Sequence, residues 1–411
     1  MKVLISAYAC EPNRGSEPGV GWEWATRMTI LHDVTIITRS NNRDVNERAL
    51  VSMESHQKPK FMYIDLPDFY LSLKKKGLLP VSLYYLLWQI HVRLNLHCEL
   101  KNYDLIHHVT FNGFRFPGAW WFTSTPVVLG PLGGCSIASK AFKRCFGNKW
   151  ISESIRALSV RCWKWNPWTL FSLLSASKVL AVGREMAGRF EELSLKPELM
   201  LETGIPRDLE QERPLSKPAD RSDFLVVGNL EPWKGWQIAM ESYAQARAKG
   251  LSDHHLIFIG QGSQMRDAIS LAKELGIHEH VKFPGALSRD ELWKIVSSAR
   301  GLIFSSIRDT SGNAALEAMA LCCPVICFNH QGVGWMTDDT SALRLEPRSW
   351  EQSIEDFSQA IMRLAGSDAL VDQLGKAARK RAMENFSWDA KIQAMTAIYE
   401  SVLKAHSSNH H

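Results

Sequence analysis

Residues 223–260 read DFLVVGNLEPWKGWQIAMESYAQARAKGLSDHHLIFIG, and this stretch decides the class of fold. It begins and ends with short, continuous apolar runs, FLVV and LIFI, which are typical of strands buried on both faces of a parallel sheet. The segment between them, residues 235–250, has a helical pattern. A strand, a helix and a second strand in this order predict a unit of two parallel strands joined by a helix.

The same alternation continues towards the C-terminus. Ser288 and Glu291 have the spacing of a capping box, which places the start of a helix at Ser288. The expected strands are residues 223–228, 255–260, 280–285, 301–306 and 324–328, and the expected helices are residues 235–250, 264–276, 313–321 and one that begins at Ser288. Such a series predicts a doubly wound α/β domain.

The N-terminal half repeats the pattern less regularly. A Gly-rich loop and a helix over residues 21–31 follow its first expected strand. The expected strands are residues 2–8, 33–39, 60–66, 103–109, 125–130 and 177–183. Residues 202–222 are rich in Pro, Arg and Glu, which is typical of a linker between domains.

We therefore predict two Rossmann-like domains, residues 1–205 and residues 206–385, with a C-terminal helix over residues 386–411 that packs back on the first domain. Ligands of open α/β sheets bind beyond the carboxyl ends of the strands. Two such sheets joined by one linker are expected to face each other across a central cleft, and we expect the active site in that cleft.

The composition fits a globular protein of this size. The chain has 411 residues, of which 45% are hydrophobic and 22% charged. This composition excludes a disordered chain, a collagen-like fibre and a small disulfide-stapled module. The formal net charge of +5 is too small to indicate nucleic-acid binding without a clustered basic patch.

No segment of the sequence approaches the ~20 apolar residues that a transmembrane helix needs. The nearest candidate, residues 78–90, is shorter and contains Pro80. The apolar part of the N-terminal run MKVLISAYAC is too short for a signal peptide, so we interpret it as a strand rather than as a lipoprotein signal ending at Cys10. We expect a cytoplasmic protein.

The eight cysteines include no C-x-x-C pair. Three of them, Cys322, Cys323 and Cys327, lie in an apolar run and lack the spacing of a zinc site. We interpret them as buried thiols, with a redox or metal role as the alternative.

The strongest chemical signal is the segment SSIRDTSGNAALEAMALCCPV, residues 305–325. A strand ends at its start, a loop follows, and a helix opens near Asn313. The unpaired N–H groups at the start of a helix bind phosphate readily. Asp309 and Glu317 are spaced so that one carboxylate can face a sugar while the other reaches a ribose hydroxyl. Taken alone, these residues also fit an ordinary helix with an acid near its start.

This segment resembles the E-x7-E motif of retaining glycosyltransferases with the GT-B fold, family 4, also called glycosyl transferases group 1. The matching positions are Asp309, Gly312, Glu317, Ala318-Met319-Ala320 and Pro324-Val325. The resemblance implies that Asp309 lies by the donor sugar and Glu317 by the ribose. It also implies that the backbone of Gly312, Asn313 and Ala314 meets the sugar and the diphosphate.

A second segment, residues 227–235, resembles the G-R-L-x-x-x-K-G loop of the same family. The resemblance implies that Lys234 neutralises the diphosphate leaving group. Asn229 stands where the family usually has a second cation, and Arg308 is a neighbour that could replace it. Two further departures are Asp309 in place of the usual Glu and Cys322 in place of a common Gly.

Weaker matches complete the resemblance. Gly262 ends a G-x-G turn, and Leu287 lies in a loop that frames the nucleotide base in the family. The N-terminal CEP and GSEPGVGW segments resemble a loop of a family 4 subgroup, which implies that Gly19 and Gly21 approach the donor phosphates or the acceptor. Gly133 ends another strand and is expected to line the same cleft. Each of these segments is also compatible with a simple turn.

His107 and His108 end the strand expected at residues 103–109. The family often shows D-x-x-H-x-H here, with the second His near the sugar, but Val109 occupies that second position. One interpretation is that either His contacts the substrate, and the other is that both are core histidines. Zinc binding is not expected, because no further ligands are nearby in the sequence.

Two basic stretches with aromatic residues lie in the N-terminal half. One contains Lys74, Lys75 and Lys76, and the other, residues 140–164, has seven Lys or Arg against one acid. Such mixtures favour an anionic membrane surface. A solvated basic face is the alternative, and nucleic acid is not an expected partner.

These observations lead to one expected function. We expect a retaining hexosyltransferase that moves a sugar from a UDP- or GDP-sugar to a hydroxyl of a glycan or lipid-linked acceptor, in bacterial cell-surface glycan synthesis, at the inner face of the cell membrane. Asp309, Lys234 and Glu317 are the expected catalytic residues, with no metal and no other cofactor. The alternatives are a sugar-nucleotide 2-epimerase and a non-catalytic sugar-nucleotide-binding scaffold.

Overall fold

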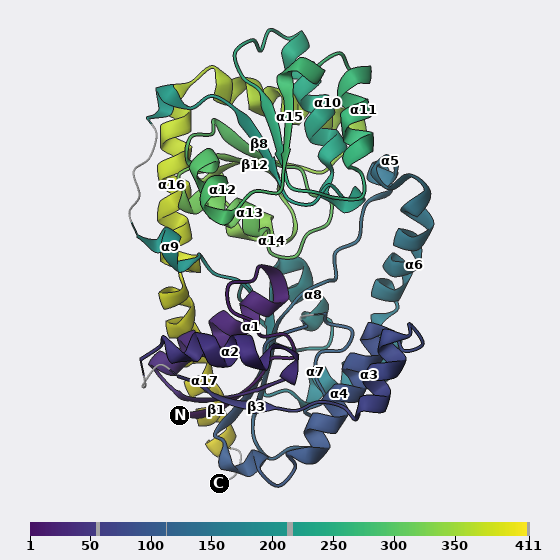
Figure 1. Ribbon diagram of the computed structural model, residues 1–411, viewed down its shortest axis with the longest axis vertical. Coiled ribbons are helices and arrows are strands. Elements are labelled where there is room, and N and C mark those ends of the chain that lie inside the picture. Colours follow the sequence, from purple (N-terminus) through teal and green to yellow (C-terminus); the bar gives the residue numbers. More distant parts are fainter. Residues whose placement is uncertain (55–57, 112, 212–216, 409–411) are drawn as a thin grey trace. The chain divides into compact units, whose positions relative to one another are not determined.

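The computed structural model describes residues 1–54, 58–111, 113–211 and 217–408, and the chain forms two compact units (Figure 1). Unit 1 comprises Met1–Cys135, Arg161–Glu202 and Lys391–His411. Unit 2 comprises Ser136–Val160 and Thr203–Ala390.

Unit 1 is built on a parallel sheet that has seven strands in the described residues, in the order β3-β2-β1-β4-β5-β6-β7. The strands are β1 (Lys2–Ser6), β2 (Asp33–Thr38), β3 (Lys60–Tyr63), β4 (Leu105–His108), β5 (Val127–Leu132), β6 (Lys178–Ala181) and β7 (Glu198–Leu199). The central strands β4 and β5 are buried along their whole length, including the two histidines that end β4. The strand order reverses between β1 and β4, and this reversal is the switch point of the sheet.

The principal helices of unit 1 include the C-terminal one. They are α1 (Ser16–Arg27), α2 (Arg43–Val51), α3 (Asp68–Lys75), α4 (Val81–Asn95), α7 (Pro167–Ser175), α8 (Arg184–Glu191) and α17 (Trp388–Ser408). Lys391 on α17 is buried, donates a hydrogen bond to the backbone oxygen of Leu201, and lies 4.8 Å from the ring centroid of Trp24. Burial lowers the pKa of Lys391 to about 7. Within unit 1, the C-terminal segment therefore packs against the sheet and its helices.

Unit 2 is built on a second parallel sheet, with six strands in its described part in the order β10-β9-β8-β11-β12-β13. The strands are β8 (Phe224–Val227), β9 (Leu256–Ile259), β10 (Val281–Gly285), β11 (Gly301–Phe304), β12 (Val325–Phe328) and β13 (Ala342–Leu345). Its strand order reverses between β8 and β11, so the switch point of this sheet lies between these two neighbouring strands.

Helices cover both faces of this sheet. In Figure 1 the strands β8 and β12 lie between α10, α11 and α15 on one side and α12, α13 and α16 on the other. The helices of unit 2 are α5 (Lys143–Phe146), α6 (Trp150–Arg161), α9 (Arg207–Glu210), α10 (Trp236–Ala248), α11 (Met265–Glu274), α12 (Arg289–Ser297), α13 (Asn313–Ala320), α14 (Gln331–Met336), α15 (Trp350–Ala365) and α16 (Asp368–Phe386). The predicted capping box of Ser288 and Glu291 is confirmed at the start of α12.

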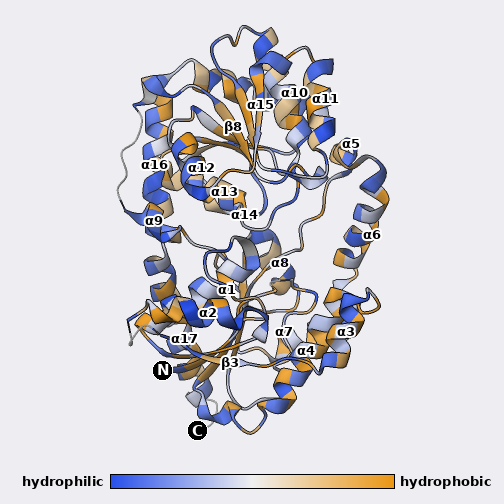
Figure 2. Cartoon of the chain, in the orientation of Figure 1, coloured by the Kyte–Doolittle hydropathy of each residue, from blue (hydrophilic) through white to orange (hydrophobic). Residues whose placement is uncertain are grey.

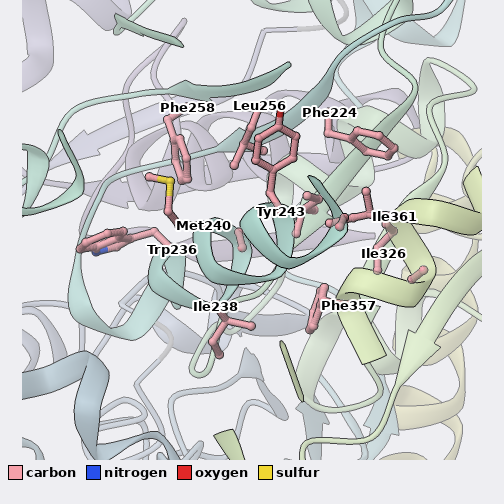
Figure 3. Packing of buried hydrophobic residues seen from close by; sticks show 14 of the residues in the cluster. Phe224, Trp236, Ile238, Met240, Tyr243, Leu256, Phe258, Ile326, Phe357 and Ile361 are labelled. Carbon is pink, nitrogen blue, oxygen red and sulfur yellow. The ribbon is translucent and has the colours of Figure 1, made fainter. Parts of the chain in front are cut away.

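The core of unit 2 fixes the strands that carry the candidate site. Figure 3 shows Phe224 and Phe258 of β8 and β9 packed over α10, which contributes Trp236 and Tyr243. All four side chains are buried. Figure 2 shows β8 and its neighbouring strands as hydrophobic, which agrees with burial on both faces. The carboxyl ends of these strands are therefore held rigidly.

The predicted doubly wound α/β fold with two Rossmann-like domains is confirmed, and so are all eleven predicted strands. The domain boundaries differ from the predicted ones, because residues 136–160 cluster with unit 2 and α17 joins unit 1 only from Lys391. The reason is that Phe142, Cys145 and Phe146 are buried in the core of unit 2. The cleft between the domains stays a prediction.

Candidate active site

A pocket lies at the switch point of the sheet in unit 2, where β8 and β11 end. It is lined by Val226, Val227, Gly228, Asn229, Leu230, Lys234, Trp236, Ile303, Phe304, Ser305 and Ser306. These residues come from the two strand ends, from the loop after each strand and from the first turn of α10. The carboxyl edge at a switch point is the general ligand site of such sheets, so this pocket is the candidate active site of unit 2.

The loops after β8 and β11 touch through a glycine. Gly235 has a φ of 61° at the N-cap of α10, and a Cβ placed on it would lie 2.1 Å from the backbone oxygen of Ser305. The Ser305 hydroxyl donates a 2.9 Å hydrogen bond to the Gly235 oxygen. Only glycine fits this close approach in a left-handed conformation, and the approach places the preceding residue, Lys234, beside the β11 loop.

Lys234, which lines this pocket, forms an ion pair with Asp309. The Lys234 Nζ lies 2.5 Å from the Asp309 Oδ2, and the two side chains are 28% and 19% exposed. The other carboxylate oxygen, Oδ1, accepts a hydrogen bond of 3.4 Å from the backbone N–H of Gly312. An internal carboxylate thus occupies a position where one ammonium and one backbone N–H both favour an anion.

Helix α13 starts beside this carboxylate. Gly312 is its N-cap with a φ of 71°, Asn313 is exposed and Ala314 is half-buried. The first N–H groups of a helix have no partner within it, and the positive end of the helix dipole lies there. The structure therefore brings together Lys234, Asp309 and the α13 start. The resemblance implied that Lys234 and the helix start bind the diphosphate and that Asp309 lies by the donor sugar, and these ligand roles stay predictions.

Two residues that the sequence did not single out hold the β11 loop. Gln331, buried and with a φ of 56°, accepts a hydrogen bond from the Asp309 N–H and donates one of 2.8 Å to the Ile307 oxygen. A Cβ on Gly332 would lie 2.0 Å from the Thr310 oxygen. The HQGVG segment that contains them offers no pattern that distinguishes Gln331 from any other polar residue in a loop after a strand.

Glu317 is one turn inside α13 and is oriented by α12. The Trp293 Nε1 donates a 3.2 Å hydrogen bond to its Oε2. Burial raises the pKa of Glu317, while the Trp293 hydrogen bond and the charge of Arg289 oppose that increase. The structure thus holds this carboxylate against Trp293, whereas Asp309 is held by Lys234.

The two candidates for a second cation differ in position. Asn229 is exposed and lines the pocket. Arg308 has its Nε 3.5 Å from the Oε1 of Glu153 on α6, and its guanidinium lies 5.2 Å from the Trp233 ring centroid. Its charge is therefore balanced by a buried carboxylate of the same unit.

Gly262 and Leu287 lie after the neighbouring strands β9 and β10. A Cβ on Gly262 would lie 2.3 Å from the backbone oxygen of Leu230, so this glycine allows the β9 loop to pack on a residue that lines the pocket. Leu287 is half-buried and directly precedes the N-cap of α12.

The structure corrects the predicted loop around Gly19 and Gly21. Helix α1 begins at Ser16, so both glycines are helical rather than part of a loop. A Cβ would lie 1.9 Å from the Arg14 oxygen at Gly19 and 2.1 Å from the Ala9 oxygen at Gly21. Close packing of α1 on the preceding loop explains both glycines. Gly133 is buried and forms a β-bridge with Gly113.

His107 and His108 are core residues of unit 1. The ring nitrogens of His107 lie 2.6 Å from the Tyr399 hydroxyl and 2.7 Å from the Gly130 oxygen. Those of His108 lie 2.7 Å from the Tyr85 hydroxyl and 3.1 Å from the Ser6 hydroxyl. Burial lowers the pKa of His107 to about 4 and that of His108 to about 3. The interpretation as substrate-contacting residues is therefore corrected, and the alternative of core histidines fits.

Comparison with known proteins agrees with the site in unit 2. Residues 208–381 match the family model of Glycosyl transferases group 1. The chain is 27% identical over 215 residues to a D-inositol 3-phosphate glycosyltransferase of Saccharomonospora viridis, covering 48% of this chain and 49% of that protein. It is 26% identical over 221 residues to the lipopolysaccharide core biosynthesis glycosyltransferase LpsE of Rhizobium meliloti, covering 53% and 62%. The chain spans about half the length of the curated relatives it matches.

Solved structures are similar over nearly the whole chain. HepE of Anabaena in complex with UDP has a TM-score of 0.61 at 16% identity and covers 98% of this chain and 100% of its own. WaaG, a glycosyltransferase involved in lipopolysaccharide biosynthesis, has a TM-score of 0.59 at 15% identity and covers 96% and 99%. The two Rossmann-like units thus have the GT-B fold, and the match to the Glycosyl transferases group 1 model is confined to residues 208–381.

Proposed function

We propose that this chain is a retaining glycosyltransferase that moves a hexosyl group from a nucleotide-diphosphate sugar to an acceptor hydroxyl. The observation that carries the proposal is the meeting of Lys234, Asp309 and the α13 start at the switch point of a group 1 domain. Structures of HepE with UDP and with UDP-glucose support a nucleotide sugar as the donor.

The donor diphosphate would take the place of the Asp309 carboxylate. Lys234 would then pair with the phosphates, and the N–H groups of Gly312, Asn313 and Ala314 would donate to them. Asp309, released from Lys234, would turn to the hydroxyls of the sugar. Glu317, oriented by Trp293, would accept from the ribose.

The transfer itself is a substitution at the anomeric carbon. The bond from that carbon to the β-phosphate oxygen breaks, and a bond to the acceptor oxygen forms on the same face of the sugar. Negative charge grows on the leaving phosphate, where Lys234 and the α13 dipole stabilise it. The acceptor proton passes to a phosphate oxygen. This chemistry needs no metal and no other cofactor, and Asn229, Gly262 and Leu287 would line the nucleoside side of the donor.

The proposed pathway is bacterial cell-surface glycan or lipid-linked saccharide synthesis in the cytoplasm. The relatives LpsE and a putative colanic acid biosynthesis glycosyltransferase, WcaL of Salmonella typhimurium, support this setting. Among the described residues, no helix combines the length and the apolar character needed to cross a bilayer.

An anionic membrane surface is the proposed site of action, through α6. Ile151, Ile155 and Leu158 are 72%, 65% and 59% exposed and share one face of this helix. Lys140 and Lys143 precede them and are exposed. Apolar side chains next to cations favour binding to anionic lipid.

The membrane proposal is tested by flotation with anionic and zwitterionic vesicles. Ile155→Asp should reduce binding to anionic vesicles, whereas Ile269→Asp, which changes an isoleucine of α11 that is 40% exposed, should not. Equal binding of both variants would contradict the role of α6.

The catalytic proposal is tested by nucleotide release. The chain is incubated with UDP- or GDP-sugars and a membrane extract, and release of UDP or GDP and a new glycosidic product are measured. An epimerase would change the sugar without transferring it to an acceptor, and a scaffold would bind the donor without turnover. Either result would replace the proposed transferase, and the comparisons favour neither.

A further inference from the structure

The switch point of unit 1 is built from aromatic rings. Tyr8 follows β1 and Phe111 follows β4, and their ring centroids lie 4.8 Å apart. The Tyr8 ring also packs edge-on against Tyr85 and Trp88, with centroids at 4.9 and 5.0 Å. Ligands of such sheets generally bind at the carboxyl edge. In unit 1 this edge consists of the packed rings of Tyr8, Tyr85, Trp88 and Phe111.

One cation, Arg39, lies on these rings, and a second, Lys74, lies on a neighbouring one. The guanidinium of Arg39, directly after β2, lies 4.0 Å from the Tyr8 ring centroid, and its Nε donates a hydrogen bond of 3.3 Å to the backbone carbonyl oxygen of Tyr8. The ammonium of Lys74 on α3 lies 4.6 Å from the Tyr84 ring centroid. Burial and the charge of Arg39 both lower the pKa of Lys74, which shows that the two cations lie within electrostatic range.

These cations lack a matching set of carboxylates. In the described parts of the chain neither Arg39 nor Lys74 forms an ion pair. Asp65 is the nearby acid, but it is exposed and its carboxylate accepts hydrogen bonds of 3.2 and 3.3 Å from the Ser40 N–H. Arg39, Lys74 and Asp65 together therefore carry one net positive charge, and Arg39 is half-buried.

The Tyr8 hydroxyl is a second, independent sign of a ligand. Tyr8 is 2% exposed, and its hydroxyl has no hydrogen-bond partner among the described residues. Burial raises the pKa of Tyr8 to about 12, while Arg39 lowers it and Tyr84 and Asp65 raise it, so the charges of Arg39 and Asp65 lie within electrostatic range of the hydroxyl. A buried hydroxyl without a partner is costly, and such groups are rare in native structures unless they have a role.

The backbone at this edge is also strained. Phe111 has a φ of 60°, which is uncommon for a residue with a bulky side chain. Its N–H donates a 2.8 Å hydrogen bond to the Glu17 carboxylate, which holds this conformation. Strain of this kind gathers at ligand sites, where the surrounding structure maintains it.

We infer that the switch point of unit 1 binds a phosphate or carboxylate group on the acceptor sugar. Arg39 and Lys74 pair with the anion, the Tyr8 hydroxyl donates to it, and the exposed face of Phe111 packs against the sugar. The inference rests on the proposed function for identifying the ligand as the acceptor. It predicts an acceptor that carries an anionic group rather than a neutral one.

The test measures binding of small probes to the full chain by isothermal titration calorimetry. Inorganic phosphate, glucose 6-phosphate and glucuronate are compared with glucose. We expect an anionic sugar to bind about tenfold tighter than glucose, as charge-assisted hydrogen bonds allow, and high salt to weaken that binding. The phosphate and carboxylate probes show which anion the site prefers. Equal binding of glucose and both anionic sugars would overturn the inference.

Two variants and one control locate the site. Arg39→Gln should weaken binding of the better anionic sugar about tenfold. Arg43→Gln removes an exposed guanidinium that also stacks on a tyrosine, 4.4 Å from the Tyr63 ring centroid, and should leave binding unchanged. Unchanged binding in Arg39→Gln would overturn the inference.

Tyr8→Phe separates a binding role from a structural one. Because the hydroxyl has no partner in the described structure, its removal should not lower the melting temperature, yet it should weaken binding of the anionic sugar at least about threefold. A lower melting temperature with unchanged binding would overturn the role of Tyr8. UDP binding is measured in parallel: if UDP binds and no anionic sugar does, this inference fails alone, whereas absence of UDP and GDP binding counts against the proposed function.

Discussion

The two sheets reverse their strand order at equivalent places, β1/β4 in unit 1 and β8/β11 in unit 2, but the two edges differ in chemistry. In unit 2 the edge consists of two loops in close contact through Gly235, an ion pair and the start of a helix. In unit 1 it consists of packed aromatic rings and the cation of Arg39. The same topology thus carries two edges of different chemistry.

The chemistry of each edge suits a different kind of ligand. Backbone N–H groups and one lysine suit a diphosphate, which every nucleotide-diphosphate sugar shares. Aromatic rings and long cationic side chains can be changed one by one, so they suit a partner that varies between proteins. The matched family model covers residues 208–381, which lie within unit 2.

The largest expected effect comes from removing the Lys234 ammonium, which pairs with Asp309 in unit 2. Lys234→Ala should lower nucleotide release about a hundredfold or more, because the charge that grows on the leaving phosphate loses its nearest partner. Binding of anionic sugars to unit 1 should stay the same. Steady-state nucleotide release and calorimetry measure the two effects.

Lys282→Ala is the matched control for that variant, since Lys282 is an exposed lysine on β10 of the same unit. It should retain the activity of the unchanged chain. If Lys234→Ala and Lys282→Ala were equally active, the pocket of unit 2 would not be the donor site.

A second variant tests whether the close contact between loops supports the site. Gly235→Ala places a Cβ 2.1 Å from the Ser305 oxygen at a φ of 61°, whereas Gly276→Ala has a similar φ of 68° and open space around it. Strain alone should cost Gly276→Ala about 1 kcal/mol of unfolding free energy. The added backbone clash should cost Gly235→Ala roughly 2 kcal/mol more. Denaturant unfolding measures both, and equal losses would show that the loops separate easily.

The sequence predicted the sheets well because their strands are buried. The two strands that it missed, β7 and β13, are the last strand of each sheet. β7 has only two residues, neither fully buried, and β13 includes Arg344. Edge strands cover less of the core, so their sequences lack the continuous apolar run that identified the others.

The sequence predicted those site residues that directly follow the ends of predicted strands. Lys234, Asp309 and Gly312 could be placed together because they flank strands that end at one edge. Gln331 could not be found, because a Gln that fixes a loop looks like any polar residue after a strand. The loop expected around Gly19 and Gly21 belongs to α1 instead, because small residues serve helix packing as well as ligand approach, and a ligand beside either glycine stays a prediction.

Buried titratable groups in the two units should also respond oppositely to acid. His107 and His108 have folded-state pKa values of about 4 and 3, below the ordinary value near 6.5, so the unfolded chain binds their protons more readily. Their contribution to stability is complete above about pH 6.5 and is lost as the pH falls, by up to about 1.4 kcal/mol per pH unit for each. Burial raises the pKa of Glu317, so its contribution instead increases as the pH falls.

Hydrogen exchange corrected for its intrinsic rate can follow both units between about pH 5 and pH 7. Protection of β4 should fall more steeply with acid than protection of β11. His107→Gln should reduce the slope in β4, whereas His278→Gln, which changes an exposed histidine of unit 2, should not. Equal slopes in the two strands would contradict the assignment of neutral, buried histidines in unit 1.

The smallest expected effect concerns the ion pair between Lys234, which lines the unit 2 pocket, and Asp309. Asp309→Asn keeps an oxygen for the Gly312 N–H but removes the charge that competes with a diphosphate for Lys234. UDP should therefore bind about three- to tenfold tighter, while sugar transfer becomes slower. Asp339→Asn, which changes an 85% exposed carboxylate paired with Arg344, should alter neither quantity. Weaker UDP binding in Asp309→Asn would show that the carboxylate supports the phosphate site rather than occupying it. Lys234, paired with Asp309, would then no longer contrast with Arg39, which forms no ion pair in the described residues.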